Sequence, residues 1–215
     1  MTSEQPMHNR VRITFSKLDS LRFIGHLDLA KTWERVLRRA QTPLAYSQGF
    51  NPQPKMQLAS ALSLGISSEC ELLDIWLTED ISLTDFCDQL NTVSPVGLRA
   101  RQAVSVPLKG PALQTILHSS EYRISTDEVD SEELQNRITD FLASEHVERV
   151  RRGKPYDLRA LVLDMRLVEG QTFWVQLSLG PRGTGRPDEL LAAMGLDFNR
   201  ARCHRTVLHL SDEKN

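Results

Sequence analysis

The chain has 215 residues, 40% of them apolar and 25% charged, and a formal net charge of −2. This length and apolar content suit one larger domain or two small ones, with a core that needs no disulfide or metal to stabilise it. The apolar runs are shorter than the roughly 20 residues of a membrane span, and the N-terminal residues lack the apolar core of a signal peptide. We therefore expect a cytoplasmic protein without membrane attachment.

The three cysteines, Cys70, Cys87 and Cys203, are widely separated and form no CxxC pair. An odd number of distant cysteines fits neither a disulfide framework nor a structural zinc site. The sequence therefore predicts buried thiols, and we expect no bound metal and no cofactor.

Acidic and basic residues are segregated along the chain. Residues 56–97 include seven acidic residues and no Lys or Arg, whereas basic residues concentrate in 22–55, 149–166 and 182–205. If these three basic segments meet in the fold, they form a positive surface of the kind that binds a phosphate-rich ligand.

The first half of the chain, residues 1–106, predicts a β-α-β-β-α-β order. Its strands are expected at 11–15, 55–60, 71–78 and 97–106. The first strand shows the alternation of Val11, Ile13 and Phe15, and a short helix is signalled by Ser82 with Asp85 three residues on. This order is the split arrangement of ferredoxin-like domains.

The helix of this half, residues 26–41, is amphipathic. At 100° per residue its apolar side chains form one stripe and its basic side chains another, opposite stripe. The basic stripe consists of Lys31, Arg35, Arg38 and Arg39. It is either a site for an anion or a merely solvated face.

Residues 107–119 include Pro107, Gly110 and Pro111, which interrupt helices and strands. This segment is therefore predicted to be a linker or a covering loop. The second half, 120–215, then repeats the pattern. Strands are expected at 121–126, 161–167, 173–177 and 206–210, with a helix capped by Asp130 and Glu133 and a short helix opened by Pro187. The predicted fold is therefore α+β, built from two ferredoxin-like halves with helices on one face of each sheet.

Three further segments could bind a ligand. The loop at 46–54 leads into Lys55 and offers two rings and several amides, which suit base stacking or simply anchor a turn. The segment around Pro155 is either a cationic patch or a solvated hairpin, and residues 180–190 form a glycine-rich loop that suits a phosphate or serves as a turn. The candidate residues in these segments are Tyr46, Gln48, Phe50, Asn51, Lys55, Arg151, Arg152, Lys154, Arg159, Arg182 and Arg186.

His26 is the one histidine in the basic 22–55 segment. With Tyr46 and Lys55 it could serve acid and base roles in metal-independent RNA cleavage. The simpler interpretation is that His26 caps the helix or packs under the loop. His26 is therefore only a weak catalytic candidate.

The chain resembles the uncharacterised radical-SAM-associated proteins, which are encoded beside or fused to a cobalamin-type radical SAM protein. Four blocks carry the resemblance: FSKLDSLRFIGHLDLAKTWERVLRRAQTPLAYSQGFNPQPK, LASALSLGISSECELLDIWL, KPYDLRALVLDM and GRPDELLAAMGL. Gly25 and Gln53 depart from the Ser and His that are more usual at these positions. The resemblance implies a partner, a radical SAM enzyme that modifies RNA or protein, rather than a reaction. The closely spaced cysteine triplet that holds the cluster of such an enzyme is missing from this sequence.

These observations leave three functional hypotheses. The first is a non-enzymatic module that binds RNA or presents a substrate to the radical SAM protein, with the basic stripe neutralising phosphates. The second is a protein-interaction subunit that docks the enzyme and binds no RNA. The third is a metal-independent ribonuclease that uses His26, which rests on analogy of fold alone.

Overall fold

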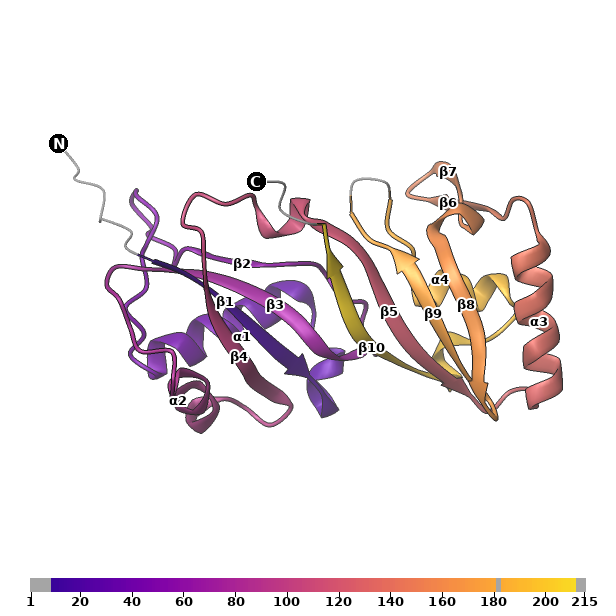
Figure 1. Ribbon diagram of the computed structural model, residues 1–215, viewed down its shortest axis with the longest axis horizontal. Helices are drawn as coiled ribbons and strands as arrows, with labels where there is room; N and C mark the ends of the chain where they lie inside the picture. The colour runs from indigo at the N-terminus through magenta and orange to yellow at the C-terminus, as the bar shows by residue number, and fades with distance from the viewer. Residues whose placement is uncertain (1–8, 181–182, 212–215) are drawn as a thin grey trace. The chain divides into compact units, whose positions relative to one another are not determined.

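The computed structural model describes residues 9–180 and 183–211. The chain divides into two compact units, residues 1–114 and 115–215, which are treated separately below. Both contain antiparallel sheets and helices (Figure 1), so the α+β class predicted from the sequence is confirmed.

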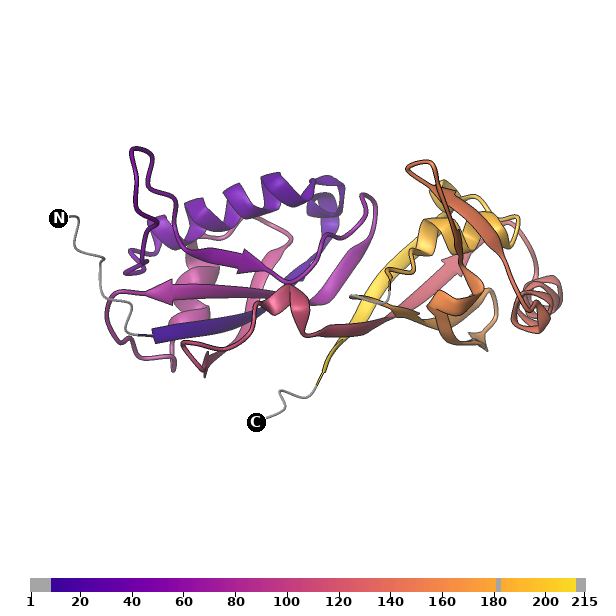
Figure 2. The ribbon, with the colours of Figure 1, turned by 90° about the horizontal axis from the view of Figure 1, so that it is seen from above.

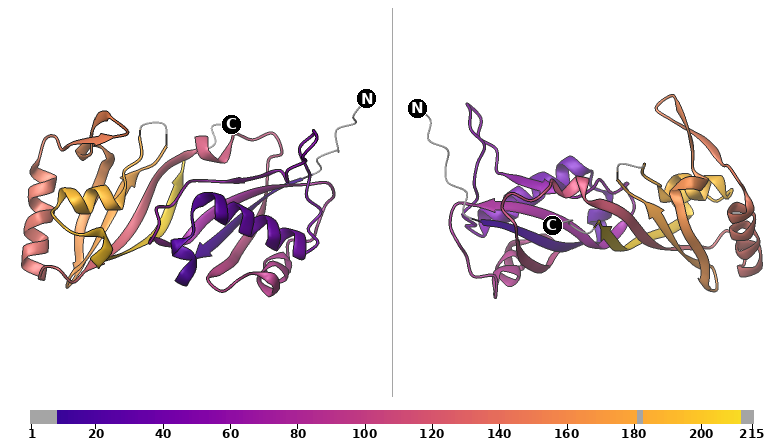
Figure 3. Two further views of the ribbon diagram at one scale, coloured as in Figure 1. Left: turned by 180° about the vertical axis from the view of Figure 1, so that it is seen from behind. Right: turned by 45° about the horizontal axis from the view of Figure 1, so that its top comes forward.

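Unit 1 contains a four-stranded antiparallel sheet in the order β4-β1-β3-β2. Its elements, in chain order, are β1 (Asn9–Lys17), the 3-10 helix η1 (Asp19–Phe23), α1 (His26–Arg39), β2 (Met56–Leu58), β3 (Ser67–Leu77), α2 (Phe86–Val93) and β4 (Leu98–Val106). Both helices lie on the same face of this sheet (Figure 3, left). A short 3-10 helix, η2 (Leu113–Thr115), follows near the end of the unit.

The core of unit 1 lies between its helices and its sheet. The predicted alternation in β1 is confirmed, because Val11, Ile13 and Phe15 are all fully buried. Trp33 of α1 packs edge-on against Phe15, with ring centroids 4.9 Å apart and an angle of 72° between the ring planes. The apolar stripe of α1 thus contacts the inward-facing residues of the sheet.

The other face of this sheet carries a buried ionic cluster. Asp74 of β3 is fully buried and accepts hydrogen bonds from Arg10, at 2.6 and 3.0 Å, and from Arg12, at 2.8 and 3.1 Å. Arg10 is also buried, and it donates to the backbone oxygens of Gly110 and Pro111 at 3.2 and 2.9 Å. The cluster therefore ties the segment after β4 to the centre of the sheet.

In unit 2, four antiparallel strands pair in the order β10-β5-β9-β8. Its main elements, in chain order, are β5 (Leu117–Thr126), α3 (Ser131–Ala143), β8 (Val162–Glu169), β9 (Thr172–Ser178), α4 (Pro187–Ala193) and β10 (Ala201–Leu210). The strands β6 (Glu148–Arg151) and β7 (Lys154–Asp157) form a separate two-stranded hairpin between α3 and β8. Two 3-10 turns, η3 (Arg159–Leu161) and η4 (Phe198–Arg200), complete the unit.

The structure corrects two predictions made from the sequence and confirms a third. The cap predicted at Ser82 is wrong, because α2 begins at Phe86 with Asp85 as its N-cap and makes no side-chain cap bond. In the strand predicted at 161–167, the alternation of Leu161, Leu163, Met165 and Leu167 indicates four side chains on the buried face. This is wrong for Leu163, whose side chain is exposed. A β-bulge between Val162 and Asp164 shifts the register there and turns Leu163 outward. The cap of α3 is confirmed, since Asp130 accepts a hydrogen bond from the backbone N–H of Glu133 at 2.9 Å.

We predict that Asp74→Asn lowers the free energy of unfolding of unit 1 by about 3 to 5 kcal/mol, because it leaves two arginines next to each other without their shared carboxylate. Urea denaturation followed by the tryptophan fluorescence of the chain, to which Trp33 and Trp76 of this unit contribute, measures the change. The control Glu79→Gln removes an exposed carboxylate and should change stability by less than about 0.5 kcal/mol. Equal effects of the two substitutions would contradict a stabilising role for the cluster.

Candidate nucleic-acid interface

Helix α1 presents a row of cations on the side opposite to the core. This α1 cationic face consists of Lys31, Arg35, Arg38 and Arg39, all of which are exposed. Arg38 pairs with Glu34 one turn earlier, at 2.6 Å, and remains 64% exposed. Within the described part of the chain, the other three cations have no carboxylate at ion-pair distance. The face therefore keeps most of its positive charge in contact with solvent.

The loop at residues 46–54 is narrow and lies between α1 and β2 in the chain. It is closed at its base by a bridge between Tyr46 and Pro54 and by a hydrogen bond from the backbone N–H of Ser47 to the oxygen of Gln53, at 2.8 Å. The Ser47 hydroxyl also accepts from the Gln53 N–H at 2.9 Å. Figure 2 shows this loop projecting beside the C-terminal end of α1.

The two aromatic rings of the loop play different parts. Tyr46 is half-buried and packs against the core of unit 1, so it anchors the base of the loop. Phe50 is fully exposed near the tip, and Gln48 and Asn51 beside it are exposed as well. The predicted pair of stacking rings is thus reduced to Phe50.

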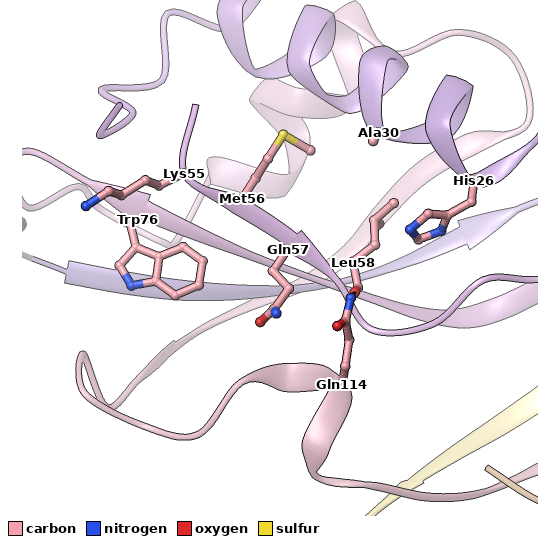
Figure 4. A pocket seen from close by; sticks show the side chains of 8 residues that line it. All are labelled: His26, Ala30, Lys55, Met56, Gln57, Leu58, Trp76 and Gln114. Carbon is pink, nitrogen blue, oxygen red and sulfur yellow. Dashed lines mark hydrogen bonds between the residues drawn. The ribbon is translucent and has the colours of Figure 1, made fainter. Parts of the chain in front are cut away.

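His26 is the first residue of α1, and its side chain does not cap the helix, because Gly25 is the N-cap. The imidazole lines a cavity of about 610 Å³ together with Lys55, while Tyr46 does not belong to the lining (Figure 4). The Nδ1 atom of His26 is buried and has no hydrogen-bond partner among the described residues. The three residues suggested for RNA cleavage are therefore not gathered in one cavity.

Sequence reasoning missed six further residues that line this cavity. Three of them can form hydrogen bonds with a ligand through their side chains: Gln57, Trp76 and Gln114. Trp76 stacks under the guanidinium of Arg10, whose central carbon lies 4.8 Å from the ring centroid. The only sequence signal was alternation, which places Gln57 and Met56 on opposite sides of a strand. The position of Gln114 depends on contacts between residues far apart in the chain.

In unit 2, Arg151 is neutralised by a carboxylate. It donates hydrogen bonds to Glu189 of α4, one of them at 2.9 Å, and to the backbone oxygen of Thr184 at 2.9 Å, and it stacks over Tyr156 at 4.7 Å. Burial is the largest single effect on Glu189 and raises its pKa. The hydrogen bonds from Arg151 and Tyr156 and the positive charges of Arg151 and Arg186 together outweigh burial, so the pKa lies below the usual value. The hydrogen bonds to Glu189 raise the pKa of Arg151.

Other predicted cations of unit 2 are also engaged. Arg159 donates to the backbone oxygens of Leu142 and Val162, at 3.3 and 3.0 Å. Arg186 pairs with Asp188 at 2.7 Å. Arg152 and Lys154 are exposed at the tip of the β6–β7 hairpin, and a binding role for them stays a prediction.

The glycine-rich loop before α4 uses its backbone N–H groups internally. Gly183 donates to the oxygen of Gly180 at 3.0 Å, and Gly185 donates to the oxygen of Ser178 at 2.9 Å. These donors are therefore not directed at an outside phosphate or carboxylate. Arg182, also predicted to bind a ligand, lies outside the described residues.

The three cysteines, all of which the structure describes, form no disulfide, but they are not all buried. Cys203 is buried, and this burial, with a smaller effect of Asp188, raises its pKa to about 12. Cys70 and Cys87 are half-buried, which corrects the prediction for both. Among residues 9–180 and 183–211, no group of three or more His, Cys, Asp and Glu side chains could hold a metal ion. No helix in these ranges is both long and apolar enough to cross a membrane.

The fold and the site define an α+β protein of two antiparallel-sheet units with an exposed cationic helix in the first. The chain belongs to the family DUF2344, described as an uncharacterized protein conserved in bacteria, whose sequence pattern matches residues 10–187. A comparison with curated proteins gives no match.

Two solved structures share a broad similarity with the chain. A structure of an H/ACA RNP bound to a substrate RNA containing 2'-deoxyuridine matches with 13% identity and a TM-score of 0.43, over 90% of this chain and 47% of the other. The archaeal box H/ACA sRNP Nop10-Cbf5 complex matches with 11% identity and a TM-score of 0.42, over 95% and 49%. The chain thus spans about half the length of these solved chains.

We predict that Glu189→Gln lowers the free energy of unfolding at pH 7 by about 1 to 2 kcal/mol, because a charged, partly buried hydrogen bond to Arg151 is lost. Since the pKa of Glu189 is lower in the folded state, its carboxylate stabilises the fold above the unfolded-state pKa. This contribution disappears as the pH falls through the folded-state pKa. The difference between wild type and variant should therefore shrink in acid.

Urea denaturation at pH 7 and at pH values below the ordinary glutamate pKa of 4.5 measures this difference. Glu145→Gln, which removes an exposed carboxylate of the same unit, should have little effect at either pH. A Glu189→Gln effect that stays constant with pH would show that the charge of Glu189 is not the cause.

Proposed function

We propose that unit 1 binds single-stranded RNA through the α1 cationic face and the loop at residues 46–54. The observation that carries this proposal is the exposure of four cations on one side of α1, with only Arg38 paired to a carboxylate of the described chain. Like charges at helical spacing repel one another, and phosphates would relieve this repulsion.

The exposed ring of Phe50 supports a single strand rather than a duplex as the ligand. An unpaired base can stack on a free aromatic face, whereas the bases of a duplex are stacked on one another already. The amides of Gln48 and Asn51 lie next to this ring in the chain and are exposed, so they can contact base edges. In this proposal α1 binds the backbone and the loop tip binds one base.

The cations of unit 2 have a smaller part in the proposal. Arg151, Arg159 and Arg186 already have carboxylate or backbone partners, so they contribute to stability rather than to a free positive surface. Of the predicted cations in this unit that the structure describes, Arg152 and Lys154 are the exposed ones. RNA affinity should therefore depend mainly on unit 1.

We further propose that both units are ferredoxin-like, because each places its third strand between its first and second in the sheet order. From the family resemblance, we propose that the chain presents RNA to a radical SAM protein. Strand cleavage is not part of this proposal, since His26, Tyr46 and Lys55 do not share a cavity.

The triple variant Arg35→Gln, Arg38→Gln, Arg39→Gln should lose most of its affinity for a fluorescently labelled single-stranded RNA. Because each phosphate contact on a single strand adds about 0.7 to the salt slope, three lost contacts should reduce the slope by about 2. Fluorescence anisotropy over a series of salt concentrations measures both quantities.

The matched control is Arg123→Gln, Arg166→Gln, Arg200→Gln, which changes the net charge equally. These three arginines are exposed on unit 2, and each has a carboxylate partner. The control should retain most of the affinity and the salt slope. An equal loss in both variants would show that RNA binding depends only on total charge, contrary to the proposal.

Phe50→Ala should weaken RNA binding by about 1 to 3 kcal/mol, which is the usual contribution of one base stacked on an aromatic ring. The salt slope should stay unchanged, because no charge is removed. Leu64→Ala removes another exposed apolar side chain of unit 1 and serves as the control. If both variants bind as wild type does, Phe50 has no stacking role.

A further inference from the structure

The outer edge of β2 has backbone groups that are directed away from the sheet. In the sheet of unit 1, β2 pairs with β3 and is an edge strand. The Trp76 N–H donates to the Lys55 oxygen at 3.1 Å, and the Ala59 N–H donates to the Leu72 oxygen at 3.0 Å. Since the backbone groups of an antiparallel strand alternate in direction, those of Met56 and Leu58 are directed away from β3.

A cavity of about 610 Å³ runs along this edge (Figure 4). His26 and Ala30, at the N-terminal end of α1, line it on one side of β2, and Gln114 lines it on the other. The side chains of Met56 and Leu58 are on the helix side, because their partners in the register, Ile75 and Leu73, belong to the core there. The outer edge of β2 is therefore the inner wall of a groove. Helix α1 bounds this groove on one side, and the segment that contains Gln114 bounds it on the other.

At this edge the side-chain amide of Gln114 occupies a position that the backbone of a neighbouring strand would otherwise take. The Nε2 group of Gln114 donates to the backbone oxygen of Leu58 at 3.3 Å. This is the hydrogen bond that the N–H of an added strand would make. The backbone N–H of Leu113 in turn donates to the side chain of Gln57 at 2.9 Å, which holds this segment next to β2. A flexible, exposed glutamine can leave this position with little loss of stability.

We propose that this groove binds an extended segment of a partner protein by strand addition to β2. Main-chain hydrogen bonds to Met56 and Leu58 would supply affinity, and alternate side chains would supply specificity. This binding surface is distinct from the α1 cationic face, because His26 and Ala30 lie about 100° or more around the helix from Lys31 and Arg35.

The lining of the groove defines the chemistry of the partner segment. On the helix side, Ala30, Met56 and Leu58 offer apolar contacts. On the other side the lining is polar, and Lys55 contributes a positive charge to the cavity. Among the described residues that line it there is no Asp or Glu. A partner strand in which apolar residues alternate with acidic ones would place its apolar side chains on the helix side of the groove and its acidic side chains on the polar side.

An RNA strand fits this edge less well than a peptide. The N–H and C=O groups of an edge strand repeat with the spacing of another polypeptide strand, and no nucleic-acid backbone offers alternating donors and acceptors at that spacing. The groove therefore favours a protein segment, and RNA protection of the same edge is an outcome that the test can detect.

The test uses the full chain and a labelled synthetic peptide in which valine alternates with aspartate or glutamate. Fluorescence anisotropy should show saturable binding, and hydrogen exchange should show slower exchange of the Met56 and Leu58 amides when the peptide is bound. The same peptide with lysine in place of its acidic residues should bind about tenfold more weakly or worse. Because much of the affinity in strand addition comes from the main chain, no binding at a peptide concentration of about 1 mM would overturn the proposal.

Met56→Pro is the informative variant, because it removes an outward N–H, while proline is tolerated at such positions of edge strands. It should lower peptide affinity about tenfold or more, whereas the control Met56→Leu, which keeps the N–H, should bind as wild type does. Gln114→Ala removes the side chain that competes for the Leu58 oxygen and should bind the peptide at least as tightly as wild type.

Hydrogen exchange on the wild-type protein keeps the test decisive even if Met56→Pro does not fold. Peptide binding without protection of the Met56 and Leu58 amides would overturn strand addition. Protection of these amides by RNA instead of by the peptide would also overturn the proposal. Failure of RNA binding at the α1 cationic face would leave this inference intact, because the two tests use different ligands and different variants.

Discussion

The arrangement of unit 1 depends on the ion pairs that the carboxylate of Asp74 forms with Arg10 and Arg12. One buried acid binds two arginines, and a buried charge is tolerated only when such partners satisfy it. Arg10 then uses its remaining donors on the backbone of Gly110 and Pro111. In this way a single ionic cluster fixes the segment that carries Leu113 and Gln114 next to β2. The groove along β2 exists because this segment is held there.

The two units use their cations differently. In unit 1, most of the cations of α1 are on the outer side of a helix whose other side is buried, so solvent or a ligand must neutralise them. In unit 2, Arg151 and Arg186 each have a carboxylate partner, so a basic stretch of sequence does not become a positive surface. Charge counts along a chain therefore overestimate the surface that can attract phosphates, because folding adds neighbours of opposite sign.

Local patterns predicted the elements well, and they failed where the backbone is irregular. The alternation of Phe173, Val175 and Leu177 in β9 corresponds to full burial of all three. The alternation predicted for residues 161–167 failed at Leu163, because the bulge between Val162 and Asp164 makes Leu163 an extra residue without a partner in the register. Likewise Tyr46 and Phe50 are similar in sequence context, yet one packs on the core and the other is exposed.

The sequence by itself determined the two faces of α1, the alternation of the main strands and the cap of α3, because these features depend on residues within a few positions of one another. Only the tertiary structure decided which arginines are neutralised and which edge of the sheet is open. Arg10 meets Pro111 across 101 positions, and Gln114 meets Leu58 across 56. No periodic pattern encodes contacts of this range, since they depend on the order of strands in the sheet and on the course of the connecting segments.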